Sequence, residues 1–316
     1  MGRPPEGGEA GHAAGSVTGK AGGLTGEADS LTGKAGGPAG RAPAPVSELP
    51  AASCRSLAVV FTDIDDTLTT GGSLPPSSYQ ALWDLFHHDI EVVPVTGRPA
   101  GWCDHIARMW PVSAVIGENG AFCYSYDRAS RKMKRRSFAG GAAAGLGPAG
   151  PGPRPLAEIA ARVLREVPGT ALAADQPFRV SDFAIDFCED VAPLGQPAVD
   201  DICRILASEG VSYRVSSIHV NFWHGQYDKM TGVRTWLEDT RGGREAAATA
   251  LGHSVFIGDS PNDEPLFAGF PLSIAVANLE RFLPRIVSLP GYITRGESAE
   301  GFCEACREIL RKREAR

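Results

Sequence analysis

Two aspartates separated by one residue follow shortly after a strongly apolar segment. Asp63 and Asp65 come after residues 57–61, which are all apolar and predict a strand buried on both faces of a parallel sheet. In extended backbone beyond such a strand, the two side chains project to the same side. One carboxylate could then attack as a nucleophile while the other exchanges a proton with a leaving oxygen. An acidic turn or a helix N-cap would use the same residues, and this pattern alone leaves that alternative open.

A second acidic group follows another predicted strand, at residues 254–257. Asp259, Asn262 and Asp263 are gathered there in a tight strand-to-helix turn that begins with Gly258. Hard oxygen ligands of this kind suit Mg²⁺, which typically takes one or two carboxylates together with water and phosphate oxygens. The alternative is an Asx-rich turn that only caps the following helix.

A hydroxyl group and an ammonium group complete the set. Thr96 and Gly97 follow a predicted strand at residues 90–95, where the hydroxyl and the backbone N–H groups could bind a phosphoryl oxygen. Lys229 begins a predicted helix and could offset charge on a transferring phosphoryl group. Read alone, these are an ordinary Thr-Gly turn and a solvated lysine, and they gain weight only beside the aspartates.

The elements that must position these residues alternate between strands and helices. The first half has predicted strands at residues 57–61, 90–95 and 114–116, separated by a helix with Ala81, Leu82, Leu85 and Phe86 on one face and by a helix at residues 102–109. After Lys229 come a helix through Val233, Trp236 and Leu237, strands at 254–257 and 272–277, and a helix at 298–314. This order predicts an α/β fold with a doubly wound, mostly parallel sheet. The chemical residues then lie at the carboxyl ends of the strands, where open α/β sheets bind ligands.

The middle of the chain has a different pattern. Between residues 122 and 227, short strands at 122–126, 132–138, 178–188, 211–218 and 219–224 surround helices at 156–167 and 199–209. Residues 140–155, rich in Gly, Ala and Pro, predict a flexible loop. The sequence therefore predicts a core made of residues 54–121 and 228–316, and an inserted α+β cap domain at 122–227 with an antiparallel sheet.

Residues 1–53 are rich in Gly, Ala, Pro and Thr and contain a degenerate seven-residue repeat at 17–37. A segment with so few large apolar residues cannot bury enough surface to offset its ordering entropy. We expect a disordered tail, and the sequence indicates no role for it.

Composition excludes several classes of protein. The 316 residues carry a formal net charge of -6, without the basic excess of a nucleic-acid binder. No apolar run predicts a secretory signal or a membrane span. Seven cysteines without regular spacing argue against a disulfide framework, and the single Cys303/Cys306 pair predicts no metal or redox site. We expect a cytoplasmic protein with no nucleic-acid or membrane partner; the sequence does not indicate its oligomeric state.

Together the four motifs resemble the signature of the haloacid-dehalogenase-like (HAD) phosphatase superfamily. In this sequence they are the DxDxT motif at 63–67, the strand-end Thr96, Lys229 and the GDxxxD motif at 258–263. The resemblance extends over residues 57–316. An insertion between the second and third motifs, preceded by Gly-Glu-Asn-Gly-Ala at 117–121, resembles subclass IIB, which includes sucrose-phosphate, mannosyl-3-phosphoglycerate and trehalose-6-phosphate phosphatases and eukaryotic-type phosphomannomutases. Asp66 departs from the pattern, because many members have Gly there.

The resemblance implies a Mg²⁺-dependent phosphatase that hydrolyses a small phosphate monoester, in particular a sugar phosphate. Asp63 would attack phosphorus and form an aspartyl-phosphate, and Asp65 would protonate the leaving alkoxide and later deprotonate the attacking water. Mg²⁺ would be held by Asp63, the Asp65 carbonyl and Asp259. Thr96 and Lys229 would bind phosphoryl oxygens.

Further residues are candidates for binding the phosphate or the rest of the substrate. On a strand, His219 and Asn221 share a face and could reach substrate hydroxyls, unless that face is simply solvated. Arg98 could contact a second anionic group or form a surface ion pair. Asp263 would orient Lys229 or a metal-bound water. Gly97, Asn119 and Asn262 complete the predicted phosphate- and substrate-binding set.

Two other functions are compatible with the motifs. A phosphomutase or phosphotransferase would use the same aspartate pair while keeping water from the phospho-enzyme. A non-catalytic phosphate-ligand-binding module would keep only the fold, but such modules usually lose one of Asp63, Asp65, Lys229 and Asp259, and all four are present.

Overall fold

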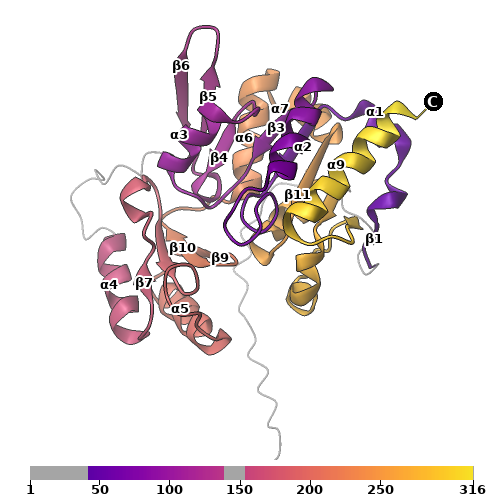
Figure 1. Cartoon of the computed structure of the whole chain (residues 1–316). Coiled ribbons are helices and arrows are strands. Elements are labelled where there is room, and N and C mark those ends of the chain that lie inside the picture. Colours follow the sequence, from indigo (N-terminus) through magenta and orange to yellow (C-terminus); the bar gives the residue numbers. More distant parts are fainter. Residues whose placement is uncertain (1–41, 139–153, 316) are drawn as a thin grey trace, which may run out of the picture. The chain divides into compact units, whose positions relative to one another are not determined.

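The central element of the protein is a six-stranded parallel sheet. The computed structural model describes residues 42–138 and 154–315, all within one compact unit, Ala35–Arg316. The sheet has the order β1-β13-β12-β11-β2-β3 (Figure 1). Its strands are β1 (Ala44–Pro45), β2 (Val59–Thr62), β3 (Glu91–Pro94), β11 (Ser254–Gly258), β12 (Ser273–Ala275) and β13 (Tyr292–Ile293).

Alternate residues of the central strands face two different helix layers. Val60 of β2 packs in one cluster with α2 (Pro76–His87), α3 (Ala100–Met109) and α9 (Ser298–Glu314). Phe61, the next residue, packs in another cluster with α6 (Lys229–Arg241), α7 (Arg244–Gly252) and α8 (Glu264–Gly269). Helices therefore cover both faces, and the predicted doubly wound α/β fold is confirmed. Residues 59–61 are apolar because both faces of β2 are buried, whereas Ala58, in the predicted strand, precedes β2 and is exposed.

The predicted face of α2 is wrong at one residue. Ala81, Leu82 and Leu85 are buried, whereas the side chain of Phe86 is 53% exposed. One residue along a helix turns the side-chain direction by about 100°, so Phe86 points away from the stripe that Leu85 extends.

Ordered structure begins earlier than the sequence predicted. Residues 44–56 form β1, a 3-10 turn η1 (Val46–Glu48) and α1 (Ala51–Ser56), although residues 44–53 were expected in the disordered tail. β1 pairs in parallel with β13, and Val46, Leu49 and Cys54 are buried in the cluster that contains α9. These few apolar residues are enough because an existing sheet edge and helix receive them. The repeat and the rest of the predicted tail, residues 1–41, lie outside the described residues.

The first hairpin assigned to the cap belongs instead to the core. β4 (Val115–Gly117), β5 (Phe122–Asp127) and β6 (Lys132–Ser137) form an antiparallel sheet, which joins the central sheet through a bridge between Val95 and Ile116. Phe122 and Tyr124 pack in the same cluster as α3. The cap therefore begins after this hairpin, and most of the predicted flexible loop lies outside the described residues.

The cap is the predicted α+β module with an antiparallel sheet. Its strand order is β7-β8-β10-β9, with β7 (Ala171–Leu172), β8 (Phe183–Asp186), β9 (Ser212–Val215) and β10 (His219–Trp223). Val220 and Phe222 pack on α4 (Leu156–Glu166) and α5 (Gln196–Ser208). The alternate residues His219 and Asn221 face the other way. β8 is shorter than the predicted strand at 178–188, because the 3-10 turn η3 (Gln176–Phe178) and a loop precede it.

Short 3-10 segments complete the structure: η2 (Glu118–Gly120), η4 (Pro261–Asp263) and η5 (Ala277–Arg285). Within the described ranges, no helix is long and apolar enough to cross a bilayer. All seven cysteines are free thiols, and Cys303 and Cys306 are buried in α9.

Candidate active site

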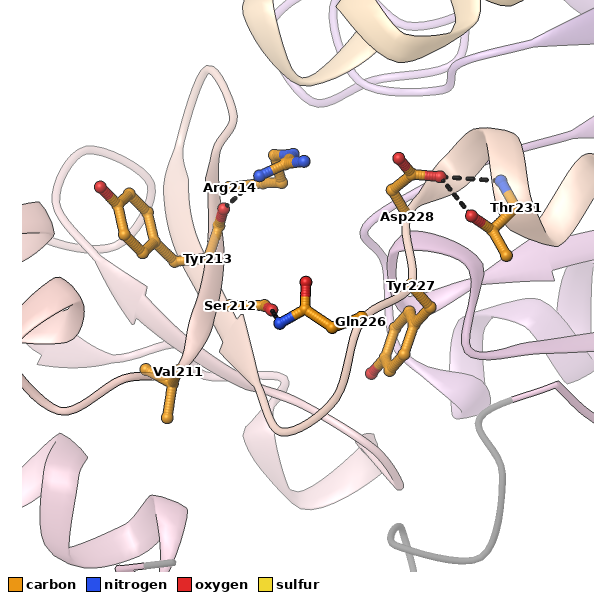
Figure 2. A pocket seen from close by; sticks show the side chains of 8 residues that line it. All are labelled: Val211, Ser212, Tyr213, Arg214, Gln226, Tyr227, Asp228 and Thr231. Carbon is orange, nitrogen blue, oxygen red and sulfur yellow. Dashed lines mark hydrogen bonds between the residues drawn. The ribbon is translucent and has the colours of Figure 1, made fainter. Parts of the chain in front are cut away.

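Two cavities lie near the predicted motifs. The more open one, of about 450 Å³, lies beside β9 and the start of α6, and Figure 2 shows its lining. Its carboxylate, Asp228, already caps α6 by accepting from the backbone N–H of Thr231 at 2.7 Å. The second cavity is smaller and contains the motif residues. It is lined by Asp63, Asp65, Gly97, Arg98, Arg179, Ser216, Ser217, Ile218, His219, Asn221, Ser260 and Asn262.

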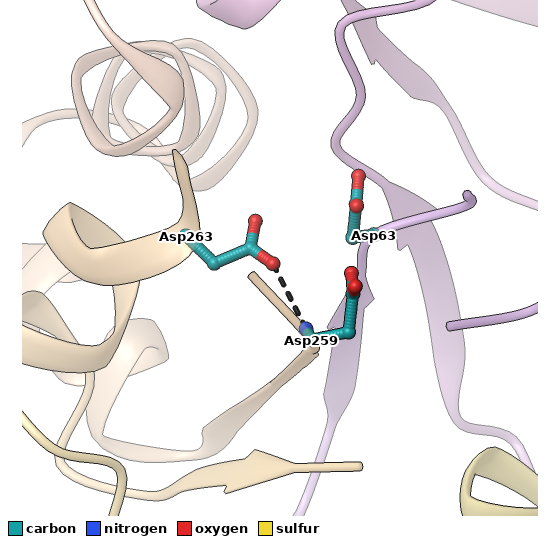
Figure 3. A group of neighbouring side chains, drawn as sticks. All are labelled: Asp63, Asp259 and Asp263. Atoms are coloured by element: carbon teal, nitrogen blue, oxygen red, sulfur yellow. Dashed lines mark hydrogen bonds between the residues drawn. The ribbon is translucent and has the colours of Figure 1, made fainter. Parts of the chain in front are cut away.

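Three buried carboxylates converge beside the second cavity. β2 and β11 are adjacent parallel strands, so the residues after them, Asp63 and Asp259, are neighbours; the N–H of Asp63 donates to the Ile257 carbonyl at 2.9 Å. One carboxylate oxygen from each of Asp63, Asp259 and Asp263 lies within 4.8 Å of the other two, and Figure 3 shows how the side chains face each other. The sequence prediction that the first and fourth motifs meet agrees with this geometry.

The turn after β11 folds the Asp263 carboxylate back onto its own backbone. Asp263 Oδ2 accepts from the N–H of Asp259 at 3.0 Å, and the side chains of Ser260 and Asp263 form a capping box. A Cβ on Gly258 would lie 2.4 Å from Asp263 Oδ2. Glycine is therefore required at position 258, because any side chain would displace this carboxylate.

Lys229 lies between two of the three carboxylates. Its Nζ donates to Asp63 Oδ1 at 2.9 Å and to Asp263 Oδ1 at 2.7 Å, and its side chain is buried. Burial alone would lower the pKa of this ammonium, but Asp263 and Asp63 raise it, so Lys229 is charged. The contact with Asp263 agrees with the expected orientation of Lys229.

Negative charge at this cluster exceeds positive charge. Burial raises the pKa of Asp63 to about 7, with Lys229 opposing this and Asp263 and Asp65 adding to it. The pKa of Asp259 is raised well above its usual value by burial and then by Asp263 and Asp63. Among the described residues, no group donates a hydrogen bond to Asp63 Oδ2 or Asp259 Oδ2. Carboxylate oxygens that belong to buried residues and receive no hydrogen bond fit a divalent cation such as Mg²⁺.

Asp65 is held by Arg98, which is buried. Arg98 donates from Nε to Asp65 Oδ2 at 2.9 Å and from Nη2 to Asp65 Oδ1 at 2.8 Å, and its guanidinium lies 4.3 Å from the ring centroid of Trp102. It also pairs with Glu189 of the cap, at 2.7 Å. The expectation of a surface ion pair is wrong, because Arg98 is only 3% exposed. Its described partners are protein carboxylates.

Thr96 and Gly97 support the loop beside Asp63. Thr96 is fully buried; its Oγ1 accepts from the N–H of Arg98 at 3.0 Å and its carbonyl accepts from the N–H of Asn119 at 3.0 Å. The carbonyl of Gly97 accepts from Arg179 Nη1 at 2.9 Å. Only Gly97 of this pair lines the cavity.

The remaining predicted binding residues lie where core and cap touch. Asn221 Nδ2 and Asn119 Nδ2 donate to the same oxygen of Asp182, at 3.0 and 3.4 Å. His219 Nε2 lies 3.0 Å from Glu189 Oε2. His219 and Asn221 are buried, so the alternative of a solvated strand face is wrong.

Asn262 lies on the core side of the cavity. Its Oδ1 accepts from Ser260 Oγ at 2.8 Å. Both residues line the cavity beside Asp63 and Asp65, so Asn262 is near the motif aspartates as the sequence predicted.

Sequence reasoning missed the charged residues that join core and cap. The buried Glu118 carboxylate accepts from the N–H of Ala100 in the core and from the N–H groups of Val180, Ser181 and Asp182 in the cap. Arg179 pairs with Asp175 and Asp182, both at 2.9 Å. Glu118 lies in the Gly-Glu-Asn-Gly-Ala stretch at 117–121, but its cap partners are more than 60 residues away and no local signal marks them. For Arg179, only the i, i+3 and i, i+4 spacing with its two aspartates was visible.

The comparisons with known proteins concern this same core. Residues 60–139 match a family model described as haloacid dehalogenase-like hydrolase. No curated protein matches the chain. A solved protein of Thermoplasma acidophilum has a TM-score of 0.59 at 14% identity, over 80% of this chain and 98% of that one. Sucrose-phosphatase from Synechocystis sp. PCC6803, solved with sucrose and phosphate, has a TM-score of 0.54 at 16% identity, over 81% and 98%. A phosphatase of the haloalkanoate superfamily from Bacteroides thetaiotaomicron has a TM-score of 0.51 at 17% identity, over 80% of this chain and 95% of that one.

These matches confirm the resemblance predicted from the motifs. The matched segment contains Asp63, Asp65 and Thr96, and the shared fold extends over both core and cap. The protein has the fold of the haloacid-dehalogenase-like hydrolases, and the predicted hydrolase class is confirmed at that level.

Proposed function

We propose that this protein is a Mg²⁺-dependent phosphatase that hydrolyses the phosphate monoester of a small polyhydroxylated compound, such as a sugar phosphate. One observation carries the proposal: three buried carboxylates with a single lysine at the carboxyl ends of adjacent parallel strands, next to a cavity that Asp65 lines. Phosphoryl transfer depends mainly on positioning and charge stabilisation, and this cluster is suited to both.

In the first step, an Asp63 oxygen would attack phosphorus while the bond to the leaving oxygen breaks. Asp65 would give its proton to that oxygen, which leaves as an alcohol. Lys229 and Thr96 would bind phosphoryl oxygens. Mg²⁺, held by Asp63, the Asp65 carbonyl and Asp259, would supply charge neutralisation when bound.

In the second step, a water oxygen would attack phosphorus of the aspartyl-phosphate. Asp65 would take the water proton, and the bond between phosphorus and Asp63 would break. Inorganic phosphate leaves, and Asp63 and protonated Asp65 are restored for the next cycle. The Asp263 carboxylate would hold Lys229 in place during both steps.

The cavity lining supports a hydrophilic leaving group. On the cap side its side chains include Ser216, Ser217, His219 and Asn221, with Ile218 as the one apolar member of the lining. Hydroxyl, imidazole and amide groups suit hydroxyl-rich ligands. Likeness to the sucrose-phosphatase fold is consistent with this class of substrate. We further propose a cytoplasmic location, consistent with seven free thiols.

The test is phosphate release from a panel of sugar phosphates and phosphoglycerate esters, with and without Mg²⁺. Asp63→Asn should lose activity by at least about 10⁴-fold, since it removes the nucleophile. Asp66→Asn is the matched control, because it is the same change three residues along, at a residue outside the carboxylate cluster. It should stay within about fivefold of the wild type, well short of the cost of losing one catalytic group.

Either of two results would contradict the proposal. One is Mg²⁺-dependent release that survives in Asp63→Asn. The other is no release from any ester by folded wild-type protein. Interconversion of phosphate isomers without net phosphate release would favour the phosphomutase alternative.

A further inference from the structure

The guanidinium of Arg98 joins one carboxylate from the core to two from the cap. Besides its three hydrogen bonds to Asp65, it donates to Glu189 from Nη2 at 2.7 Å and from Nη1 at 3.3 Å, and its Nη1 lies 3.5 Å from Asp175 Oδ2. The planar ring of Trp102 supports it from one side. The closest cap partner is Glu189, and paired bonds of the kind that Arg98 makes to Glu189 and Asp65 fix geometry as well as adding energy.

Glu189 is itself fixed by the cap. It lies in the loop after β8, where Asp186 Oδ1 accepts from the N–H groups of Cys188 and Glu189, both at 2.8 Å, and Asp186 Oδ2 accepts from that of Asp190 at 2.8 Å. On the other side of the Glu189 carboxylate, His219 Nε2 lies 3.0 Å from Glu189 Oε2. Burial would raise the pKa of Glu189, but His219 and Arg98 lower it to about 2. The side chain is therefore ionised beside Arg98, and Asp186 fixes the backbone of its loop.

We propose that Glu189 is the positioning residue of the cap: it holds Arg98 so that the Arg98 guanidinium orients the Asp65 carboxylate, and Asp65 is correctly oriented only while the cap is docked on the core. This inference rests on the proposed function, in which Asp65 transfers protons. Glu189 touches neither phosphate nor nucleophile in this scheme. It acts through Arg98, so its loss should impair proton transfer without removing the phosphate site.

Coupling of this kind has a chemical use. With the cap undocked, the cavity would be open to any ester, and a correctly oriented Asp65 would then protonate the leaving group of the wrong one. Tying the orientation of Asp65 to a cap residue restricts proton transfer to the state in which Ser216, Ser217 and His219 surround the leaving group.

The experiment compares Glu189→Gln with Glu209→Gln in the full-length protein. Glu209 is the matched control, because it is also a cap carboxylate that bonds arginines, Arg154 at 2.9 Å and Arg162 at 2.6 Å. For the best sugar phosphate of the panel, Glu189→Gln should lower kcat by about 10- to 100-fold, part of the ~10²–10⁴-fold that a positioned acid or base contributes. KM should change less than about threefold, because phosphate binding by Lys229 is retained. Glu209→Gln should leave both constants unchanged, and melting temperatures report whether each variant folds.

A second substrate separates positioning from general damage. 4-Nitrophenyl phosphate releases a phenolate that needs no proton, so attack by Asp63 should be spared while the later water attack, which needs Asp65 as base, is slowed. Glu189→Gln should therefore give a burst of one nitrophenolate per enzyme followed by slow turnover, and Asp65→Asn should do the same more strongly. Glu189→Ala serves as a second variant that places no new amide beside Arg98.

Three outcomes would overturn the inference alone: Glu189→Gln as fast as Glu209→Gln, a loss confined to KM, or equal slowing of both phases without a burst. Absence of turnover in the wild type would overturn the proposed function as well.

Discussion

The core and cap sides of the cavity handle charge in opposite ways. On the core side, Asp63, Asp259 and Asp263 share one cation, Lys229, and two carboxylate oxygens receive no hydrogen bond from the described residues. Between core and cap, charged groups pair with each other: Arg98 of the core with Glu189, and Arg179 with Asp175 and Asp182. The core cluster can therefore take an added cation. The groups between core and cap are paired already, and they fix the cap and shape the cavity.

This difference gives a rule for interpreting buried charge. Buried ionic groups that satisfy each other add specificity and cost little once paired, whereas a buried group left without a partner points to a missing ligand. We therefore expect changes in the core cluster to affect chemistry first. Changes between core and cap should affect docking and stability first, except at Glu189, which acts on chemistry through Arg98.

Removing the single cation of the core cluster should have the largest effect. Lys229→Met should lower kcat by about 10²–10³-fold, the usual cost of losing one group that stabilises transition-state charge. Steady-state phosphate release measures this. Lys134→Met is the control, because Lys134 is largely exposed and should show no change. Retention of more than a tenth of wild-type kcat in Lys229→Met would contradict the expectation that changes in the core cluster affect chemistry first.

Metal binding should stabilise the protein through the core cluster alone. Mg²⁺ at 100 times its dissociation constant should stabilise the folded state by about 2.7 kcal/mol, because only the folded state assembles the site. Thermal unfolding with and without Mg²⁺ measures the shift, which chelator should reverse. Asp259→Asn should lose the shift and Asp66→Asn should keep it; an equal shift in both variants would show that Mg²⁺ binds elsewhere.

Glu118 gives a smaller, pH-dependent effect on the contact between core and cap. Burial, followed by the charge of Asp182, raises the pKa of Glu118 from its usual 4.5 to about 7. The folded state then binds the proton more tightly than the unfolded state does. Its contribution to stability is therefore full below pH 4.5 and is lost as pH rises through 7.

Glutamine does not titrate, so the Glu118→Gln variant should not lose this contribution to stability as pH rises. The advantage of the wild type over Glu118→Gln should shrink by about 1–3 kcal/mol between pH 4.5 and pH 8. Chemical denaturation at several pH values measures it, with Glu209→Gln as control. A wild-type advantage that grows with pH would show that the four backbone N–H groups outweigh burial.

The same contrast explains what the sequence could predict. Asp63 and Asp259 were recognisable because parallel strands bring their carboxyl ends together, so local pattern and order along the chain were sufficient. Lys229, at the start of α6, gained weight only beside these aspartates. Glu189 and Arg98 are 91 residues apart, and nothing local marks them as partners. Residues 44–53 were missed for a related reason: Val46 and Leu49 become core residues only when β13 and α9 are present to receive them.

The predicted boundary between core and cap was wrong because a β-hairpin can belong to either part. The β5–β6 hairpin looks like the cap strands in sequence, since alternation of apolar and polar residues is common to both. Its assignment to the core depends on Phe122 and Tyr124 packing beside α3, which is a tertiary contact.

The most direct test of the account is the covalent intermediate on Asp63. In the Asp65→Asn variant, Asp63 should still attack the phosphorus of the substrate. The resulting aspartyl-phosphate should hydrolyse slowly, because the base that activates water is gone. Incubated with 4-nitrophenyl phosphate and Mg²⁺, quenched in acid and analysed by peptide mass spectrometry, the variant should carry one phosphate on the peptide that contains Asp63. Phosphate on another residue, or none on a folded protein that still releases nitrophenolate, would contradict the assignment of Asp63 as the nucleophile.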